Sequence, residues 1–262
     1  MSSLLACVTT HRELVENLVL RDIKARYKQS VLGYAWAVFN PLVFSLTYTL
    51  VGKFILRQQT GLPFPLFAYF GVLFWNIFGT GIASATESLI AHLGLITKVY
   101  FPREVLPISA VVSKLFDFVF GLFGVIPFLL VYQIMPSWGF FLALPIVLIL
   151  CLFTAGMGML CATANLFYRD VRYLVMISTN ILGFLWPNMY TLEQIPERFR
   201  PFYLLNPVAT CIEAARRLTF PQVGSMDALW PFVGISAALS VSVFCLGYAV
   251  FKRYEPYFAE AI

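Results

Sequence analysis

Six long apolar stretches alternate with short polar segments along the chain. A helix that crosses a bilayer needs about 20 predominantly apolar residues, and each stretch approaches or exceeds that length. The stretches cover residues 31–56, 64–85, 105–132, 138–167, 174–190 and 229–251. The pattern predicts an all-α polytopic membrane protein with six transmembrane helices. The fifth stretch is the shortest, and Pro187 interrupts it; Pro41 predicts a kink within a first helix that starts near Val31.

A charged segment, residues 12–30, precedes the first apolar stretch. Its apolar residues recur with the period of a helix face, and they are Leu14, Val15, Leu18, Val19, Ile23 and Tyr27. The opposite face carries charged residues, including the basic Arg21, Lys24, Arg26 and Lys28. This pattern predicts an amphipathic helix lying in the membrane surface, with its basic face toward anionic headgroups. Two functions fit it: a topological anchor, or a surface that guides a lipid-linked anionic substrate.

The composition excludes an ordinary soluble domain. Of 262 residues, 60% are hydrophobic and 12% charged, whereas soluble domains contain about 25% charged residues. The mean hydropathy is +0.81. The five cysteines and two histidines show no metal-ligand spacing, and the net charge of +5 does not indicate nucleic-acid binding. We expect one domain over residues 1–262, comprising a surface helix (1–30), spans (31–190), an outer segment (191–228), a last span (229–251) and a tail (252–262).

The distribution of basic residues predicts the orientation. Eleven arginines and lysines lie in the N-terminal segment, the loops after the second and fourth spans, and the C-terminal tail; six lie on the opposite side. Basic residues accumulate on the cytoplasmic side of membrane proteins. We therefore expect both termini in the cytoplasm and the chain in the cytoplasmic (inner) membrane.

Two charged residues, Lys114 and Asp117, fall inside the third apolar stretch. Charges within a membrane are costly, so they usually face a bundle interior or a wet cavity. Because residues three apart share a helix face, the two side chains can neutralise one another. A structural pair is the simpler interpretation, and an ion relay the alternative.

The loop of residues 87–104, between the second and third spans, contains a short apolar and aromatic stretch between Gly94 and Pro102. We expect residues 95–101 to form a short helix across the cytoplasmic face that presents Tyr100 and Phe101. A partner protein or the lipid interface could take up these exposed aromatics. The residues that would make this contact are Leu95, Lys98, Tyr100 and Phe101.

The outer segment, residues 191–228, is expected to contain helices of its own. Asn206 can cap a helix that begins at Pro207, and Glu213, Arg216 and Arg217 fall at i,i+3 and i,i+4 spacing within it. The preceding IPERFRPFYLL mixes apolar residues with two arginines. We expect short re-entrant pieces, which a membrane tolerates only where they are shielded from lipid.

Aromatic residues make up 17% of the chain, and many lie inside the spans. Aromatic faces stack on sugar rings, although packing is the commoner function of an aromatic on a membrane helix. The candidates for a glycan path are Phe39, Tyr48, Phe184 and Trp186. A phosphate-binding loop of the GxxxxGK[ST] type does not occur in the sequence. We therefore expect no cofactor in this chain; if transport is driven by ATP, the ATPase that binds ATP and magnesium is another chain.

Four runs of residues resemble the ABC-2 type permeases that export lipid-linked polysaccharides, the membrane subunits of O-antigen, capsule and teichoic acid ABC exporters. They are RDIKARYKQSVLGYAWAVFNPL (21–42), KVYFPREVLPISAVVSKL (98–115), NLFYRDVRYLV (165–175) and IPERFRPFYLLNP (195–207). The similarity covers nearly the whole chain, in order. It implies a homodimer bound to two ATPase subunits, with the energy-consuming enzyme outside this chain.

The resemblance also implies roles for individual residues. The N-terminal helix would be a gate beside the lateral access of an undecaprenyl-diphosphate-linked glycan, residues 95–101 a coupling helix seated in the ATPase, and a channel at the dimer interface would be lined by the four aromatics above. The residues around the headgroup would be Arg21, Lys24, Arg26, Lys28, Arg169 and Arg172. The outer gate would comprise Ile195, Phe199, Glu213, Arg216 and Arg217.

Three other classes of protein remain open. An exporter of drugs, lipids, teichoic acid or capsule would have the same fold. An intramembrane glycosyl- or acyltransferase would need clustered acids or histidines, but Glu87, His92, Glu104 and Asp170 are spread over two loops without a motif. An ion-coupled carrier or channel would use Lys114 and Asp117. The interpretation we adopt is a permease for polysaccharide, with O-antigen as the first choice of substrate.

Overall fold

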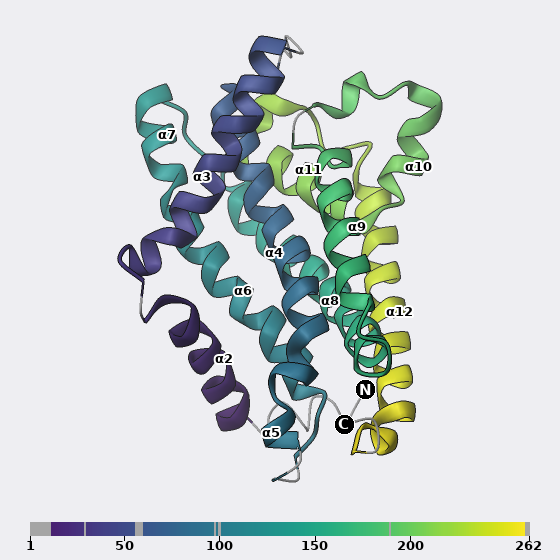
Figure 1. Cartoon of the computed structure of the whole chain (residues 1–262). Coiled ribbons are helices and arrows are strands. Elements are labelled where there is room, and N and C mark those ends of the chain that lie inside the picture. Colours follow the sequence, from purple (N-terminus) through teal and green to yellow (C-terminus); the bar gives the residue numbers. More distant parts are fainter. Residues whose placement is uncertain are drawn as a thin grey trace.

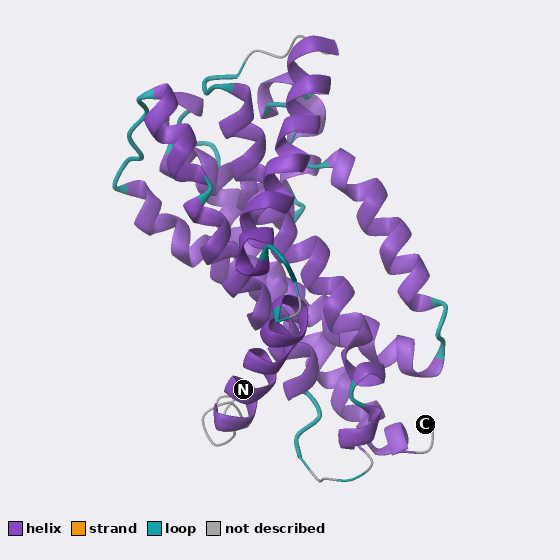
Figure 2. Ribbon diagram, turned by 60° about the vertical axis from the view of Figure 1, so that its left-hand side comes forward, coloured by secondary structure: helices purple, strands orange, loops and turns teal. Residues whose placement is uncertain are grey.

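The structure, a computed structural model, describes residues 12–28, 30–55, 60–96, 98, 101–188 and 190–259. Within these residues the regular elements are helices and no strand occurs (Figure 2). The fold is therefore all-α, as the hydrophobic pattern predicts.

Five helical segments are long and apolar enough to cross a membrane. They are Gly33–Lys53, Phe64–Ala91, Val105–Tyr132, Gly139–Phe167 and Trp230–Phe258. The helices within them are α3 (Trp36–Thr49), α4 (Phe64–Ala91), α6 (Val105–Phe123), α7 (Val125–Tyr132), α8 (Gly139–Phe167) and α12 (Trp230–Tyr254). These segments match five of the six predicted spans.

The remaining predicted span, the fifth (residues 174–190), corresponds to α9 (Val171–Leu185), which is shorter than the others. Its 15 residues measure about 22 Å at 1.5 Å per residue, whereas the bilayer core is about 30 Å thick. The helix ends because Trp186 precedes Pro187 and has an extended backbone, with ψ at 161°; a residue before proline is disfavoured in the α region.

The remaining elements are short, apart from α2 (Arg12–Tyr27) and α11 (Pro207–Thr219). They are η1 (Gly33–Ala35), η2 (Leu50–Ile55), α5 (Leu93–Ile96), η3 (Leu192–Gln194), η4 (Glu197–Phe199), α10 (Arg200–Leu204), η5 (Pro221–Val223) and η6 (Glu255–Ala259). In Figure 1, α2 lies beside α6 at the end of the bundle that also holds α5, whereas α10 and α11 lie toward the opposite end.

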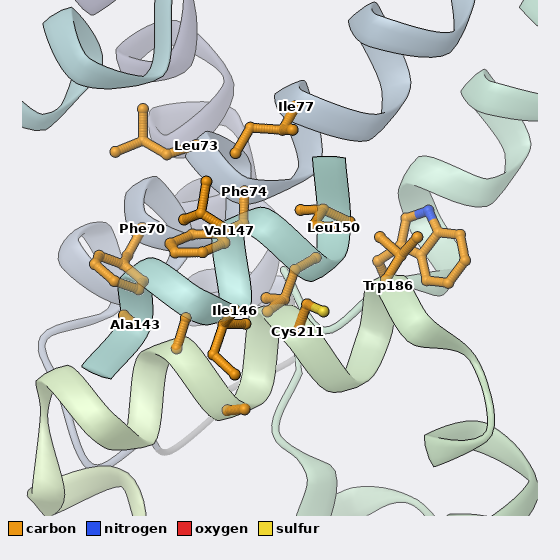
Figure 3. Close-up of a cluster of buried hydrophobic side chains, with 14 of the residues drawn as sticks. Phe70, Leu73, Phe74, Ile77, Ala143, Ile146, Val147, Leu150, Trp186 and Cys211 are labelled. Atoms are coloured by element: carbon orange, nitrogen blue, oxygen red, sulfur yellow. The ribbon is translucent and has the colours of Figure 1, made fainter. Parts of the chain in front are cut away.

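The core forms around α4, which packs against α3, α6, α8, α9 and α11. Its buried side chains face those of α8, with Phe70, Phe74 and Ile77 opposite Val147 and Leu150 (Figure 3). Helix α11 closes this core from a third direction, and every one of its residues is buried. A short helix that carries Glu213, Arg216 and Arg217 thus lies inside the molecule, and its re-entrant path stays a prediction.

Small residues bring α8 and α12 close together. A Cβ added to Gly247 of α12 would lie 2.3 Å from the carbonyl oxygen of Gly156 in α8. Ser236 and Ser240, on the same helix as Gly247, are also completely buried. Membrane helices approach closely where such small residues meet, so packing without bulky side chains joins this pair.

Two features of the spans bear on the predictions. Helix α3 continues through Pro41, as predicted, after a 3-10 turn that starts at Gly33. The stretch predicted as one helix over residues 105–132 is instead divided at Gly124 into α6 and α7. At the break the Tyr69 hydroxyl donates a hydrogen bond of 2.8 Å to the Gly121 carbonyl, and a Cβ at Gly124 would collide with that hydroxyl.

Candidate functional site

A polar cavity of about 350 Å³ lies between α2, α3, α4 and α6. Helix α2 packs along α6 with one face only, which includes the buried residues Leu18 and Ile23. The cavity lies beside this contact, and both helices line it. The polar residues that line it come from all four helices and the turn after α2: Arg26, Tyr27, Ser30, Asn40, Asn76, Thr80, Lys114 and Asp117. Such a volume falls within the usual range of ligand sites, about 300 to 1,000 Å³.

Asp117 of α6 is the centre of the polar contacts in this cavity. Arg26 of α2 donates a hydrogen bond to its Oδ2, and the Tyr27 hydroxyl donates to its Oδ1 at 2.8 Å. The Nζ of Lys114 lies 3.9 Å from Oδ2. Arg26 also donates to the Ser113 hydroxyl at 2.9 Å. One carboxylate therefore joins the surface helix α2 to a membrane helix.

The predicted pair of Lys114 and Asp117 is present, but Asp117 has closer partners than Lys114. Arg26 and Tyr27 are 91 and 90 residues away in sequence, so spacing along one helix could not reveal them. Burial raises the pKa of the Tyr27 hydroxyl above its ordinary value, and the hydrogen bond to Asp117 acts in the same direction. Tyr27 thus remains a hydrogen-bond donor at neutral pH.

The formal charge of this group is positive, because Arg26 and Lys114 face a single carboxylate. Lys114 is buried, and the Arg26 and Asp117 side chains are 28% and 23% exposed. Cations in a partly dehydrated site form short, strong hydrogen bonds with carboxylate and phosphate oxygens. The cavity is therefore suited to an anionic group.

The basic residues predicted around a headgroup do not all gather here. Arg21, Lys24 and Lys28 are exposed on α2 or just after it, and Arg169 is exposed in the turn before α9. Arg172 lines a separate cavity of about 410 Å³ between α4 and α9. Of the predicted headgroup residues, only Arg26 lines the cavity beside α2. Nothing in the sequence indicated that Tyr27, Asn40, Asn76 and Thr80 would line it as well.

The predicted charge cluster of the outer segment is formed inside the protein. Glu213 accepts from Arg216 Nη1 at 3.1 Å and from Arg217 Nε at 2.8 Å. Arg216 is completely buried, donates to the Pro187 carbonyl at 2.7 Å, and lies 3.7 Å from the centre of the Phe67 ring. These contacts attach α11 to α4 and to the end of α9.

Other predicted features of the outer segment can also be located. Asn206 caps α11, since its side chain accepts from the Val208 amide at 3.0 Å. Ile195 is half-buried and Phe199 exposed, whereas Arg217 extends the cluster to Glu193 at 2.8 Å. These contacts hold α11 in place inside the protein. That α11 acts as an outer gate stays a prediction.

The predicted cytoplasmic helix of residues 95–101 differs in the structure. Helix α5 covers Leu93–Ile96, Lys98 is exposed, and Tyr100 lies outside the described residues. Phe101 is only 8% exposed and packs with Leu18 and Ile96, and Leu95 packs at the edge of the same cluster. The expectation that Phe101 faces a partner was wrong, because the underside of α2 offers this ring an apolar site within its own chain.

The candidate aromatics for a glycan path have different environments. Phe39 is 46% exposed on α3. Tyr48 is buried, and Trp186 is buried against Trp75, with ring centres 5.3 Å apart. The side chain of Phe184 lies outside the described residues. In this single chain, Phe39 is therefore the candidate among these that is seen to reach the surface.

These features define an all-helical membrane protein with several apolar helices and a cationic cavity beside its N-terminal helix α2. Residues 13–220 match the family described as ABC-2 type transporter, and the chain belongs to that family.

Individual relatives span almost the same length. The chain is 31% identical to the O-antigen export system permease protein RfbA of Klebsiella pneumoniae over 252 residues, 95% of each chain. It is 31% identical to the protein of the same name from Myxococcus xanthus over 255 residues, 96% of each. Identity to the polysialic acid transport protein KpsM of Escherichia coli is 24% over 213 residues, 79% of this chain and 81% of that one.

Proposed function

We propose that this chain is the membrane permease of an ABC exporter that moves an undecaprenyl-diphosphate-linked polysaccharide, O-antigen in the first instance, across the cytoplasmic membrane. The observation that carries the proposal is the similarity at 31% identity, over 95% of both chains, to an O-antigen export permease. Capsular polysaccharide is the second candidate, since the relatives named for polysialic acid and capsule export match at 24% and 21% identity. A teichoic acid exporter has the same expected fold.

The energy for export would come from another chain. The sequence contains no GxxxxGK[ST] loop, which nucleotide-binding subunits use to hold phosphates. In this proposal two permease chains assemble with two ATPase subunits. The exposed Lys98 and the neighbouring α5 then belong to the surface that meets the ATPase, and ATP and magnesium bind only to the partner.

The arrangement in the membrane follows the sequence prediction. Six spans, with α9 as a short fifth span extended by the residues after it, would leave both termini in the cytoplasm. The positive end of the molecule would hold α2 at the inner leaflet, while η4 and α11 would form the outer gate. The lateral position of α2 beside α6 supports access from the lipid phase.

The diphosphate end of the lipid-linked polysaccharide would enter before the sugars. Arg21, Lys24 and Lys28, all exposed, attract the diphosphate at the membrane surface, and the cavity at Arg26 receives it. Sugars would then pass along aromatic faces at the interface of two chains. Phe39 is exposed for such stacking, whereas Tyr48 and Trp186 need a movement of the helices to reach a glycan.

The proposal is tested by complementation. A strain that lacks its O-antigen permease but keeps its ATPase receives this chain, and surface O-antigen is detected with antibody. We expect restored surface polymer with the wild type and strongly reduced polymer with the double variant Lys24→Glu/Arg26→Glu, because negative charge on the exposed face of α2 and in the cavity repels the headgroup. Both forms should still co-purify with the ATPase.

The matched control is Arg253→Glu, a reversal of an exposed charge at the end of α12, which should export like the wild type. Wild-type export by the double variant would refute the assigned function of the basic face. Failure of the wild type to complement in strains for O-antigen and for capsule would refute the proposed function itself.

A further inference from the structure

The contact between α2 and α6 consists of two unlike halves. The N-terminal half of α2 is held by apolar packing, with Leu14, Val15 and Leu18 in a cluster that includes Phe101. The C-terminal half buries Ile23 and adds polar contacts, in which Arg26 and Tyr27 donate to Asp117. An anion can take over the polar contacts, but it offers nothing to the apolar contacts of Leu14, Val15 and Leu18. The C-terminal half of α2 is therefore the part that an anion can release.

Asp117 occupies the place that a bound anion would take. Its two oxygens accept from both Arg26 and Tyr27, and Lys114 Nζ is 3.9 Å away. These are the donors that also line the cavity of about 350 Å³. Because the Asp117 side chain is 23% exposed, it borders that cavity and can turn away from its partners without unfolding of α6.

A diphosphate competes well for these donors. It brings more oxygens and more charge than a carboxylate, so it can engage Arg26 and Lys114 together through charge-assisted hydrogen bonds. Once it is bound there, Asp117 becomes a neighbouring like charge, and like charges a few ångströms apart disfavour one another. The anion and Asp117 therefore compete for Arg26, and the link between α2 and α6 is the contact that the stronger competitor breaks.

We propose that Asp117 is an internal occupant of an anion site formed by Arg26 and Lys114, and that a diphosphate headgroup displaces it and so releases the C-terminal half of α2 from α6. The identity of the anion as a diphosphate rests on the proposed function. The displacement gives the surface helix a way to respond to the headgroup alone, before any contact with sugars. Asp117 is thus a positioning residue for α2 and a competitor of the substrate.

The proposal predicts that removal of the carboxylate strengthens anion binding. Purified permease in detergent is titrated with geranyl diphosphate, with geraniol as the uncharged probe. We expect Asp117→Asn to bind the diphosphate about tenfold more tightly, the equivalent of one lost repulsion of about 1.4 kcal/mol. Asp117→Glu should resemble the wild type, and Arg26→Gln or Lys114→Gln should bind at least about tenfold more weakly.

Amide hydrogen exchange of α2 gives a second readout, taken on the wild type with ligand and on Asp117→Asn without it. Released helices exchange faster because they open locally. We expect geranyl diphosphate to speed exchange over residues 22–27 of the wild type while residues 14–18 stay protected, and we expect fast exchange of residues 22–27 in Asp117→Asn without ligand. Geraniol should change neither.

Three results would overturn the displacement: weaker or unchanged binding by a folded Asp117→Asn variant, binding that persists in both Arg26→Gln and Lys114→Gln, or slower exchange of residues 22–27 with the diphosphate. Neither measurement reads export. A chain that complements export but shows no response of α2 would refute the displacement alone. A chain that responds to the diphosphate but exports nothing would refute the proposed function and leave the displacement standing.

Discussion

Two glutamates of the outer segment form ion pairs with an arginine three residues later, in opposite surroundings. The Glu213 side chain is 1% exposed and pairs with Arg216, whereas the Glu197 side chain is 90% exposed and pairs with Arg200 at 3.7 Å. A buried charge that loses its counter-ion is costly, while an exposed pair contributes little. Because both pairs have the same i,i+3 spacing, a difference between their contributions to stability measures the effect of burial.

At this scale we predict that Glu213→Gln lowers stability by about 3–5 kcal/mol, because Arg216 and Arg217 lose their shared carboxylate inside the protein. Glu197→Gln should cost at most about 1 kcal/mol. The stability of both variants is measured by thermal unfolding in the same detergent, with the remaining yield of monodisperse protein as the readout. Similar shifts for the two variants would show that the cluster does not stabilise α11.

The sequence reveals such local contacts but not the distant ones. Spacing predicted the ion pairs of Glu213 and the cap by Asn206, since both depend on residues within one helical turn. It also singled out Asp117 as a costly charge. It could not predict that Arg26 and Tyr27 satisfy that charge, because the contact depends on where α2 comes to lie against α6.

At the scale of elements, helices α8 and α12 approach each other closely at Gly156 and Gly247. A Cβ at Gly247 would meet the backbone of Gly156, whereas a Cβ at Gly234, on the same helix, would meet nothing within 4 Å. A backbone atom cannot move aside as a flexible side chain can, so an added methyl group must separate the helices.

We therefore predict that Gly247→Ala lowers the melting temperature in detergent and reduces the folded yield in the membrane, with a loss of about 1–3 kcal/mol. Gly234→Ala should be neutral or stabilising by up to about 1 kcal/mol, since alanine favours a helix over glycine. If Gly247→Ala behaves like Gly234→Ala, the close packing of α8 on α12 is not a determinant of the fold.

Ion pairs and hydrogen bonds hold the C-terminal turn η6 against the start of α6. Lys252 contacts Glu104 and Glu255 at 2.8 Å each, and Arg103 donates to the Glu255 carbonyl at 2.9 Å. Glu104 is buried at the start of α6, and Phe258 packs against Phe251. These contacts tie the end of the chain to the loop that follows α5.

We predict that Lys252→Met loosens this tie, because the buried carboxylate of Glu104 loses its cation. Residues 255–259 should be cleaved faster by protease in the variant, and their amides should exchange faster. Arg253→Met, at the neighbouring exposed position, is the control. Equal protection of η6 in the wild type and in Lys252→Met would contradict the assigned contact.

For the whole molecule, the hydrophobic pattern predicted the class and most of the architecture. Five long apolar helical segments and the helix α2 follow from the length and period of apolar residues alone. Two features did not: the break at Gly124 and the buried Phe101. Each of them depends on packing between distant segments or on backbone geometry that a hydrophobic window averages away.

At the scale of the whole molecule, helix α2 connects the cationic cavity to an apolar cluster between the helices. Helix α2 contacts the cluster that includes Ile96 and Phe101 through its N-terminal half, and the cavity through its C-terminal half. A movement imposed on the loop after α5 would therefore reach the cavity through α2. In the proposed exporter, this is the path by which an ATPase and a headgroup act on the same helix.

The central claim is tested most directly by transport in a purified system. The chain is reconstituted with its ATPase in proteoliposomes that contain polysaccharide linked to undecaprenyl diphosphate, and access of the polymer to an impermeant glycosidase in the lumen is followed. We predict polymer cleavage that requires ATP, the ATPase and the diphosphate-linked lipid together. Cleavage without ATP, or none with all components present and the ATPase active, would contradict the account.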